Sequence, residues 1–261
     1  MRSINRITSL FERKKENILS IYFTAGFPEL SSTENIIAAL QKSGADMLEI
    51  GIPFSDPIAD GPVIQQSNKK AIENGMTLQL LFEQLKTIRS HVNIPIILMG
   101  YLNPVYQMGI ENFLQKCTDI GIDGVIIPDL PAEIYKTQYQ QAFHKHNIFN
   151  VFLITPKTKP ERIKYLDGLS EGFLYLVSSS GTTGKDTIFH EEEYQRINDM
   201  KLNNPLLIGF GIHDRASYEN ACKHARGAIV GSAFIKALEK SSSPENISSF
   251  IHSLTTPILC N

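Results

Sequence analysis

The feature that most constrains the fold of this chain is a short, nearly uninterrupted apolar run that recurs from one end to the other. Each run is followed by a turn and then by a segment with helical spacing. The predicted strands cover residues 18–24, 46–50, 94–99, 124–127, 150–154, 173–177, 205–208 and 228–230. Continuous rather than alternating apolar strands are typical of a parallel sheet that helices cover. About eight such units in one chain indicate a (β/α)8 barrel.

The length of the chain and the pattern of its N-terminal segment favour the same architecture. The chain has 261 residues, and α/β barrels commonly run to roughly 250 residues as one unit, so we expect residues 1–261 to form a single domain. Ile4, Ile7, Leu10 and Phe11 fall on one helical face, which predicts an extra N-terminal helix packed on the core. The predicted fold class is therefore α/β, a TIM barrel with that added helix. A doubly wound open sheet is the alternative, but no GxGxxG motif follows the first strand.

Composition excludes several classes of function. Lys plus Arg number 25 against 27 Asp plus Glu, so the chain has no basic excess to attract nucleic acid. Cys117, Cys222 and Cys260 are too scattered for a disulfide framework, which fits a reducing cytoplasm. No apolar run reaches the roughly 18 residues that a membrane span needs. We expect a cytoplasmic protein with neither a membrane nor a nucleic acid as partner.

The stretch DMLEIGIPFSDPIADGP at residues 46–62 is the strongest candidate for chemistry. Active sites of such barrels form at the carboxyl ends of the strands, and Glu49 lies where its strand ends. It is either a solvated or paired strand-end residue, or a general acid/base whose pKa its apolar neighbours raise. Asp60, in the following loop, is either an ordinary turn residue or a second catalytic carboxylate held in a different protonation state from Glu49. Tyr175 is either core or a hydrogen-bond donor to a substrate or to Glu49.

Glycine-containing segments follow the last three predicted strands, on the side of the barrel opposite Glu49. They are Thr183-Gly184, Gly209-Phe210-Gly211 and Gly231-Ser232. Glycine lets backbone N–H groups converge on a phosphate, ideally at a helix N-terminus. The pairs therefore predict a phosphate site, although the same glycines could simply turn the chain, with Ser232 as an N-cap. Histidines form neither HxH nor HExxH, and no GxSxG occurs, so we expect no metal and no serine nucleophile. Acid/base chemistry on a phosphorylated small molecule remains.

The chain resembles the alpha subunits of tryptophan synthase over nearly its whole length. LEIGIPFSDPIADGP at Leu48 is similar to the signature of that family, and YFTAGFP, LMGYLNPV, VIIPDLP, GTTG, GFGI and VGSA follow in the family's order. The resemblance implies a lyase that cleaves indole-3-glycerol phosphate to indole and glyceraldehyde 3-phosphate. It further implies that Glu49 is the acid/base and that Asp60 binds the indole N–H.

The same resemblance assigns further residues. Those implied to hold the phosphate are Gly184, Gly211, Gly231 and Ser232, with Thr183 in a closing loop. Those implied to wall the indole pocket are Tyr22, Ile64, Met99, Ile126, Tyr175 and Phe210. Tyr22 stands where some members have Phe, and Phe27 stands where Asp is frequent, so pocket shape is where this chain departs from the pattern.

The resemblance also implies a partner. Family members dock on a beta subunit that carries pyridoxal phosphate (PLP) in an alpha2-beta2 complex, and this chain itself would hold no cofactor. The docking surface would include Pro53, Asp56, Asn103, Pro104, Asp129 and Pro131. Two other functions stay open: another phosphosugar isomerase or aldolase on the same barrel, and a mainly non-catalytic barrel that activates its partner. The lack of a lysine at the strand ends argues against a Schiff-base aldolase.

Overall fold

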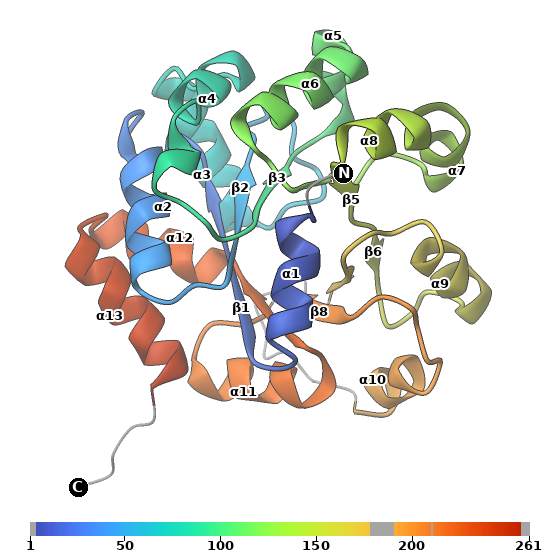
Figure 1. The fold of residues 1–261 in the computed structure, drawn as a ribbon. Coiled ribbons are helices and arrows are strands. Elements are labelled where there is room, and N and C mark those ends of the chain that lie inside the picture. Colours follow the sequence, from blue (N-terminus) through green and yellow to red (C-terminus); the bar gives the residue numbers. More distant parts are fainter. Residues whose placement is uncertain (1–3, 178–190, 210, 257–261) are drawn as a thin grey trace, which may run out of the picture.

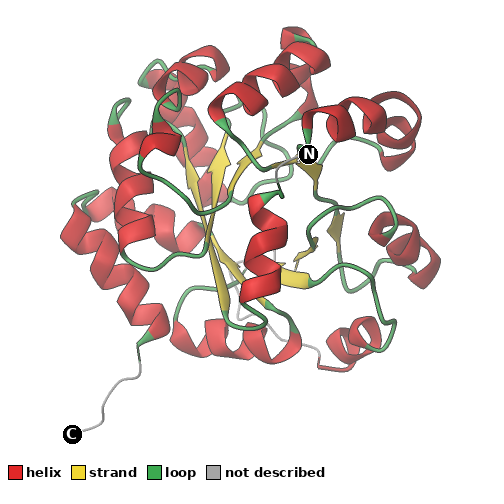
Figure 2. Ribbon diagram, in the orientation of Figure 1, coloured by secondary structure: helices red, strands yellow, loops and turns green. Residues whose placement is uncertain are grey.

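The computed structural model describes residues 4–177, 191–209 and 211–256. Its centre is a parallel nine-stranded sheet in the order β5-β4-β3-β2-β1-β9-β8-β7-β6, with helices outside it (Figures 1 and 2). The strands are β1 Ile18–Thr24, β2 Met47–Gly51, β3 Ile96–Met99, β4 Gly124–Ile126, β5 Phe149–Asn150, β6 Leu153–Ile154, β7 Leu174–Val177, β8 Leu206–Gly209 and β9 Gly227–Val230. The predicted α/β barrel is confirmed.

The predicted fifth strand, residues 150–154, is wrong in one respect, because it is divided into β5 and β6. Its first half pairs with β4 and its second half with β7. The change of partner occurs at Val151, whose N–H donates to Val125, and at Phe152, whose carbonyl accepts from Tyr175. β5 and β6 are the first and the last strand of the sheet, and only Val151 and Phe152 separate them along the chain. The strands therefore close into a ring.

Helices follow most strands, as predicted. Those of the first half are α2 Ser32–Lys42, α3 Pro62–Glu73, α4 Leu78–Gln84, the 3-10 turn Ile88–Ser90, α5 Leu102–Met108 and α6 Ile110–Ile120. Those of the second half are α7 Ala132–Ile134, the π-helical turn Tyr135–Tyr139, α8 Gln140–His146, α9 Pro160–Asp167, α10 Glu191–Asn198, α11 Arg215–His224, α12 Ser232–Lys240 and α13 Pro244–Thr255. Among the described residues, no helix combines the length and apolarity that crossing a membrane requires.

The predicted N-terminal helix is α1, Arg6–Arg13, which Figure 1 shows in front of the strands. Ile7 and Leu10 are buried in the apolar cluster inside the barrel, and Asn5 caps the helix by accepting from the Ile7 N–H. Ile4 was expected on the buried face but is 70% exposed, because the helix begins only after it. The helix therefore fills the end of the barrel that lies opposite the strands' carboxyl ends.

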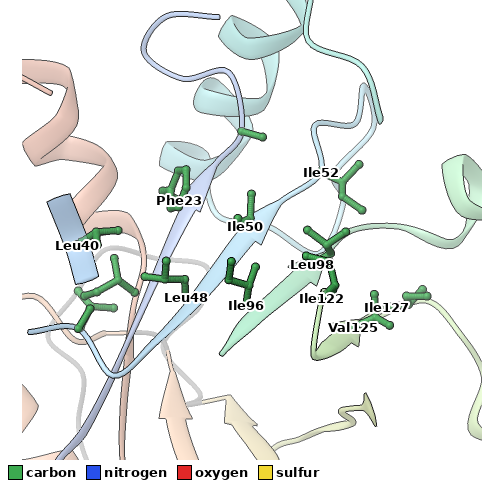
Figure 3. Close-up of a cluster of buried hydrophobic side chains, with 14 of the residues drawn as sticks. Phe23, Leu40, Leu48, Ile50, Ile52, Ile96, Leu98, Ile122, Val125 and Ile127 are labelled. Atoms are coloured by element: carbon green, nitrogen blue, oxygen red, sulfur yellow. The ribbon is translucent and has the colours of Figure 1, made fainter. Parts of the chain in front are cut away.

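Side-chain alternation in the strands decides which residues face the interior. In β2, Leu48 and Ile50 belong to the outer core that packs under the helices, with Phe23 and Leu98 from the neighbouring strands (Figure 3). Met47 belongs to the inner cluster instead. Because successive side chains of a strand point to opposite faces, Glu49 shares the interior with Met47.

Candidate active site

Glu49 is fully buried inside the barrel near the end of β2. It lies beside Tyr22 of β1 and Ile97 of β3 in the strand register. Its Oε1 accepts a hydrogen bond from the Ser20 hydroxyl at 2.9 Å, whereas Oε2 is buried without a partner among the described residues. Burial raises the pKa of Glu49 to about 8, against the opposing effect of the Ser20 hydrogen bond. This carboxyl is mainly protonated at neutral pH, which favours the general acid/base over the solvated strand-end residue, the two interpretations that the sequence leaves open.

Asp60 lies in the loop between β2 and α3 and is only partly covered. The Tyr101 hydroxyl donates to its Oδ2 at 3.2 Å, and that hydroxyl also accepts from the Ala59 N–H at 3.0 Å. Burial raises the pKa of Asp60 to about 6, while the Tyr101 hydrogen bond lowers it. Asp60 is therefore mainly ionised at neutral pH, the opposite state to that of Glu49.

Tyr22 and Tyr175 occupy equivalent positions on β1 and β7. Two residues after Tyr22, Thr24 pairs with Gly51 on β2. Two residues after Tyr175, Val177 pairs with Gly209 on β8. A β carbon built on either glycine would lie 2.2 Å from the corresponding tyrosine hydroxyl oxygen. The glycines therefore let both rings lie across the neighbouring strand. Burial raises the pKa of Tyr22 and of Tyr175 well above the usual value, and the nearby Asp60 and Glu49 carboxyls raise both further, so both hydroxyls stay neutral.

A cavity of about 510 Å³ lies beside these groups. Most of the residues assigned from the sequence line it: Tyr22, Asp60, Ile64, Met99, Tyr175, Gly211, Gly231 and Ser232. Glu49 and Ile126 do not line it, and both are fully buried in the barrel interior. Thr183, Gly184 and Phe210 lie outside the described residues. One cavity therefore joins Asp60 and the two tyrosines to the glycine segments after β8 and β9.

The glycine end of the cavity meets the N-terminus of α12. Gly231 is the N-cap, and no side chain caps the helix there. The first N–H groups of a helix lack intrahelical acceptors and favour an anion. Lys236, one helical turn after Ser232, also lines the cavity and adds a positive charge. This end suits a phosphate group.

Sequence reasoning did not single out Ser20, Tyr101 or Lys236. Ser20 is a hydroxyl residue within an apolar strand, two residues before Tyr22, and that parity alone indicates the barrel interior. Tyr101 comes just after β3 at the barrel mouth, and Lys236 follows Ser232 by four residues on a helix. These positions are visible in the sequence, but the role of each residue follows only when the structure shows which carboxylate or helix end lies beside it.

The residues expected at a partner interface lie on three neighbouring connections, which follow β2, β3 and β4. Asn103 and Pro104 belong to the first turn of α5 rather than to a loop. Asp129 accepts from the Leu102 N–H at 2.8 Å and so ties this helix to the connection after β4. Asp56, Asn103, Asp129 and Pro131 are exposed, while Pro53 and Pro104 are partly buried. Ile58 and Tyr106, on the same segments, are 88% and 65% exposed.

Comparison with known proteins follows the same pattern. The family model described as tryptophan synthase alpha chain matches residues 9–255. The tryptophan synthase alpha chain of Flavobacterium psychrophilum is 53% identical over 251 residues, covering 95% of this chain and 98% of the relative. That of Bacteroides thetaiotaomicron is 51% identical over 245 residues, covering 93% and 96%.

Solved structures agree with the sequence relatives. The tryptophan synthase alpha subunit of Legionella pneumophila superposes with a TM-score of 0.87 at 33% identity, covering 97% of both chains. A chain of the tryptophan synthase complex of Pyrococcus furiosus gives 0.83 at 36% identity, covering 92% of this chain and 98% of that one. On the evidence of sequence, fold and site together, this chain belongs to the tryptophan synthase alpha chain family.

Proposed function

We propose that this chain cleaves indole-3-glycerol phosphate to indole and glyceraldehyde 3-phosphate, as the alpha half of tryptophan synthase, with Glu49 and Asp60 as its catalytic groups. One observation carries the assignment of residues. The ionised Asp60 lines a cavity whose other side is an uncapped helix N-terminus, and the protonated Glu49 is buried next to Tyr22, which lines the same cavity. Such a pair can move a proton and stabilise a positive charge at the same time.

The two carboxyl groups and the substrate supply every proton and electron pair that the cleavage requires. Glu49 gives its proton to the indole carbon that carries the glycerol phosphate chain, which leaves the ring positively charged. The ionised Asp60 accepts a hydrogen bond from the ring N–H and stabilises that charge. The adjacent chain hydroxyl then returns a proton to Glu49 as its oxygen forms a carbonyl. The carbon–carbon bond breaks, and its electrons neutralise the ring.

Glu49 does not line the cavity in this structure, so the proposal includes a rotation of its side chain toward the bound substrate. Tyr22, its register neighbour, and Tyr175 form the wall that the carboxyl must pass. Ile64 and Met99 supply the apolar wall for the indole ring. Thr183, Gly184 and Phe210 are proposed to complete the closing loop, the phosphate site and the ring pocket.

The direct test is indole formation from indole-3-glycerol phosphate by the purified chain, measured with and without a tryptophan synthase beta subunit. Indole formation that rises with the beta subunit supports the proposal. No indole under either condition would overturn it.

The phosphate site can be tested separately. Ser232→Asp places a negative charge at the α12 N-terminus and should raise KM for the phosphorylated substrate at least tenfold. Ser243→Asp is the matched control, because Ser243 caps the N-terminus of α13, where aspartate caps equally well. Equal KM values for the two variants would place the phosphate elsewhere.

The proposed partner is the PLP-bearing beta subunit, which would dock on the connections after β2, β3 and β4 through Pro53, Asp56, Asn103, Pro104, Asp129 and Pro131. Ile58 and Tyr106 support this placement, because they expose an apolar and an aromatic side chain, 88% and 65% accessible, on these same connections. Ile58→Glu should weaken activation by the beta subunit. Ile4→Glu is the control, since Ile4 is 70% exposed beside α1. Equal activation of both variants would contradict the placement.

A further inference from the structure

Ser20 is a fully buried hydroxyl residue in the apolar strand β1. It pairs with Met47 in the strand register, and Tyr22, two residues later, pairs with Glu49. Both side chains therefore point into the barrel. The Glu49 carboxyl reaches back along the strands to meet Ser20, with 2.9 Å between the hydroxyl oxygen and Oε1. Ser20 is thus in contact with the proposed acid/base without lining the cavity.

The two oxygens of Glu49 have different surroundings. Oε1 accepts from Ser20, and Oε2 is buried with no partner among the described residues. In a protonated carboxyl group, one oxygen is a carbonyl acceptor and the other carries the proton. The carbonyl oxygen of a carboxylic acid accepts a hydrogen bond better than its hydroxyl oxygen does, and the oxygen that accepts from Ser20 is Oε1. The proton therefore belongs on Oε2.

We propose that Ser20 is a positioning residue for Glu49, whose hydroxyl fixes Oε1 as the acceptor and leaves Oε2 as the oxygen that carries the transferable proton. The inference rests on the proposed function of Glu49, since it concerns how that proton is held. Ser20 does not touch substrate in this scheme. Its effect is to set the pH range over which the enzyme carries its proton before substrate binds.

The groups that face Glu49 allow this effect to be isolated. Tyr22 from β1 and Tyr175 from β7 interact electrostatically with Glu49, Asp60 from the loop interacts with both tyrosines, and Ile97 of β3 is apolar. The two tyrosines stay neutral because burial raises the pKa of both well above the working range. Of these three groups, Asp60 changes charge near neutral pH, and its side chain receives a hydrogen bond from Tyr101, whereas Ser20 donates to Glu49.

A hydrogen bond to an ionised carboxylate favours that form, typically by about tenfold or more. Ser20→Ala removes this bond, so Glu49 should hold its proton to higher pH. The pH dependence of kcat/KM reports the ionisations of the free enzyme. We expect its falling alkaline limb to move upward by roughly one pH unit in Ser20→Ala. Ser20→Thr, which keeps the hydroxyl, should restore the limb to its original position.

Ser170→Ala is the matched control. Ser170 is also buried, but its hydroxyl donates to the Phe173 carbonyl at 2.7 Å, so its role is structural. This variant should lose stability without moving the alkaline limb. If Ser20→Ala does not fold, Ser20→Cys replaces it, because a thiol of nearly the same size donates only weakly and should move the limb in the same direction.

An infrared measurement provides a readout that needs no turnover. The carboxylic acid C=O band of Glu49 is assigned from the difference between the wild-type chain and Glu49→Gln. Loss of a hydrogen bond to the carbonyl should move that band to higher frequency in Ser20→Ala. An unmoved band and an unmoved alkaline limb would overturn the inference while Glu49→Gln remains inactive. Retained turnover by Glu49→Gln would instead overturn the proposed function.

Discussion

The two carboxyl groups of the site come from one short segment, yet they lie in different kinds of structure. Glu49 is held on β2, fully buried, with one hydrogen bond from a neutral hydroxyl. Asp60 lies on the following loop, partly open to solvent, with a phenol as its donor. Their pKa values are raised to about 8 and about 6, both mainly by burial. The strand thus keeps one carboxyl neutral at pH 7, and the loop leaves the other negatively charged.

This difference assigns roles that side-chain chemistry alone leaves open. A protonated carboxyl can act as a general acid, and an ionised one can stabilise a cation. Depth of burial separates the two, because Asp60 is partly exposed to solvent, which stabilises its charge, whereas Glu49 is fully buried. Exchanging the two environments would exchange the roles.

Replacing each carboxyl in turn gives the largest expected effects. Glu49→Gln has no acidic proton and should lower kcat for cleavage by about 10²–10⁴-fold. Asp60→Asn cannot neutralise the charged ring and should lower it by about 10²-fold. Asp56→Asn is the control, because Asp56 is an exposed carboxylate of the same loop. Indole release by the isolated chain is the measurement. Near-normal turnover by either active-site variant would remove that residue from the mechanism.

The pH dependence of kcat/KM should show both groups at once. Activity requires Asp60 ionised, so it should fall below about pH 6, and Glu49 protonated, so it should fall above about pH 8. A bell-shaped profile with its maximum near pH 7 is expected. In Asp60→Asn the residual activity should lose the acid limb and keep the alkaline one. A profile that rises continuously to pH 9 would show that Glu49 acts first as a base.

The pH dependence of protein stability should also differ between Glu49 and Asp60, with a smaller effect than the one on activity. The unfolded chain releases the Glu49 proton near pH 4.5 and the folded chain near 8, so the folded state binds more protons between these values. The free energy of unfolding therefore falls as pH rises through this window, by about 5 kcal/mol. Relative to wild type, Glu49→Gln should gain stability up to pH 8. Asp60→Asn should gain only up to about pH 6.

Urea unfolding at pH 5, 6, 7 and 8 measures these differences. Parallel curves for wild type and Glu49→Gln would mean that Glu49 is ionised in the folded chain. That outcome would contradict the assignment of the general acid even if the variant were inactive.

Most of the fold could be predicted from the sequence, since a buried parallel strand reads as a continuous apolar run. Residues 18–24 were predicted as a strand and form β1, Ile18–Thr24. The division at Val151 and Phe152 could not be predicted, because both residues are as apolar as a strand interior and the break lies in which neighbour the backbone bonds. Glu49 was located by its position at a strand end. Asp60 needed the resemblance, because Asp-Gly-Pro is ordinary turn chemistry.

The role of Tyr101 in the candidate site could not be predicted from the sequence. It comes from the connection after β3, far along the chain from Asp60, and its role depends on a contact between two connections. Its ring also stacks on Phe54 with centroids 5.0 Å apart, which places the hydroxyl against the loop. No spacing rule links a tyrosine after one strand to an aspartate after another.

Tyr101→Phe should therefore sharpen the contrast between the two carboxyls by a small, directed change. The phenylalanine keeps the stack on Phe54 but removes the hydrogen bond that lowers the pKa of Asp60. The acid limb of kcat/KM should move to higher pH, with activity at pH 6 reduced by roughly three- to tenfold. The alkaline limb, set by Glu49, should stay in place. Movement of both limbs would show that the two carboxyls titrate as one coupled pair rather than as two independently tuned groups.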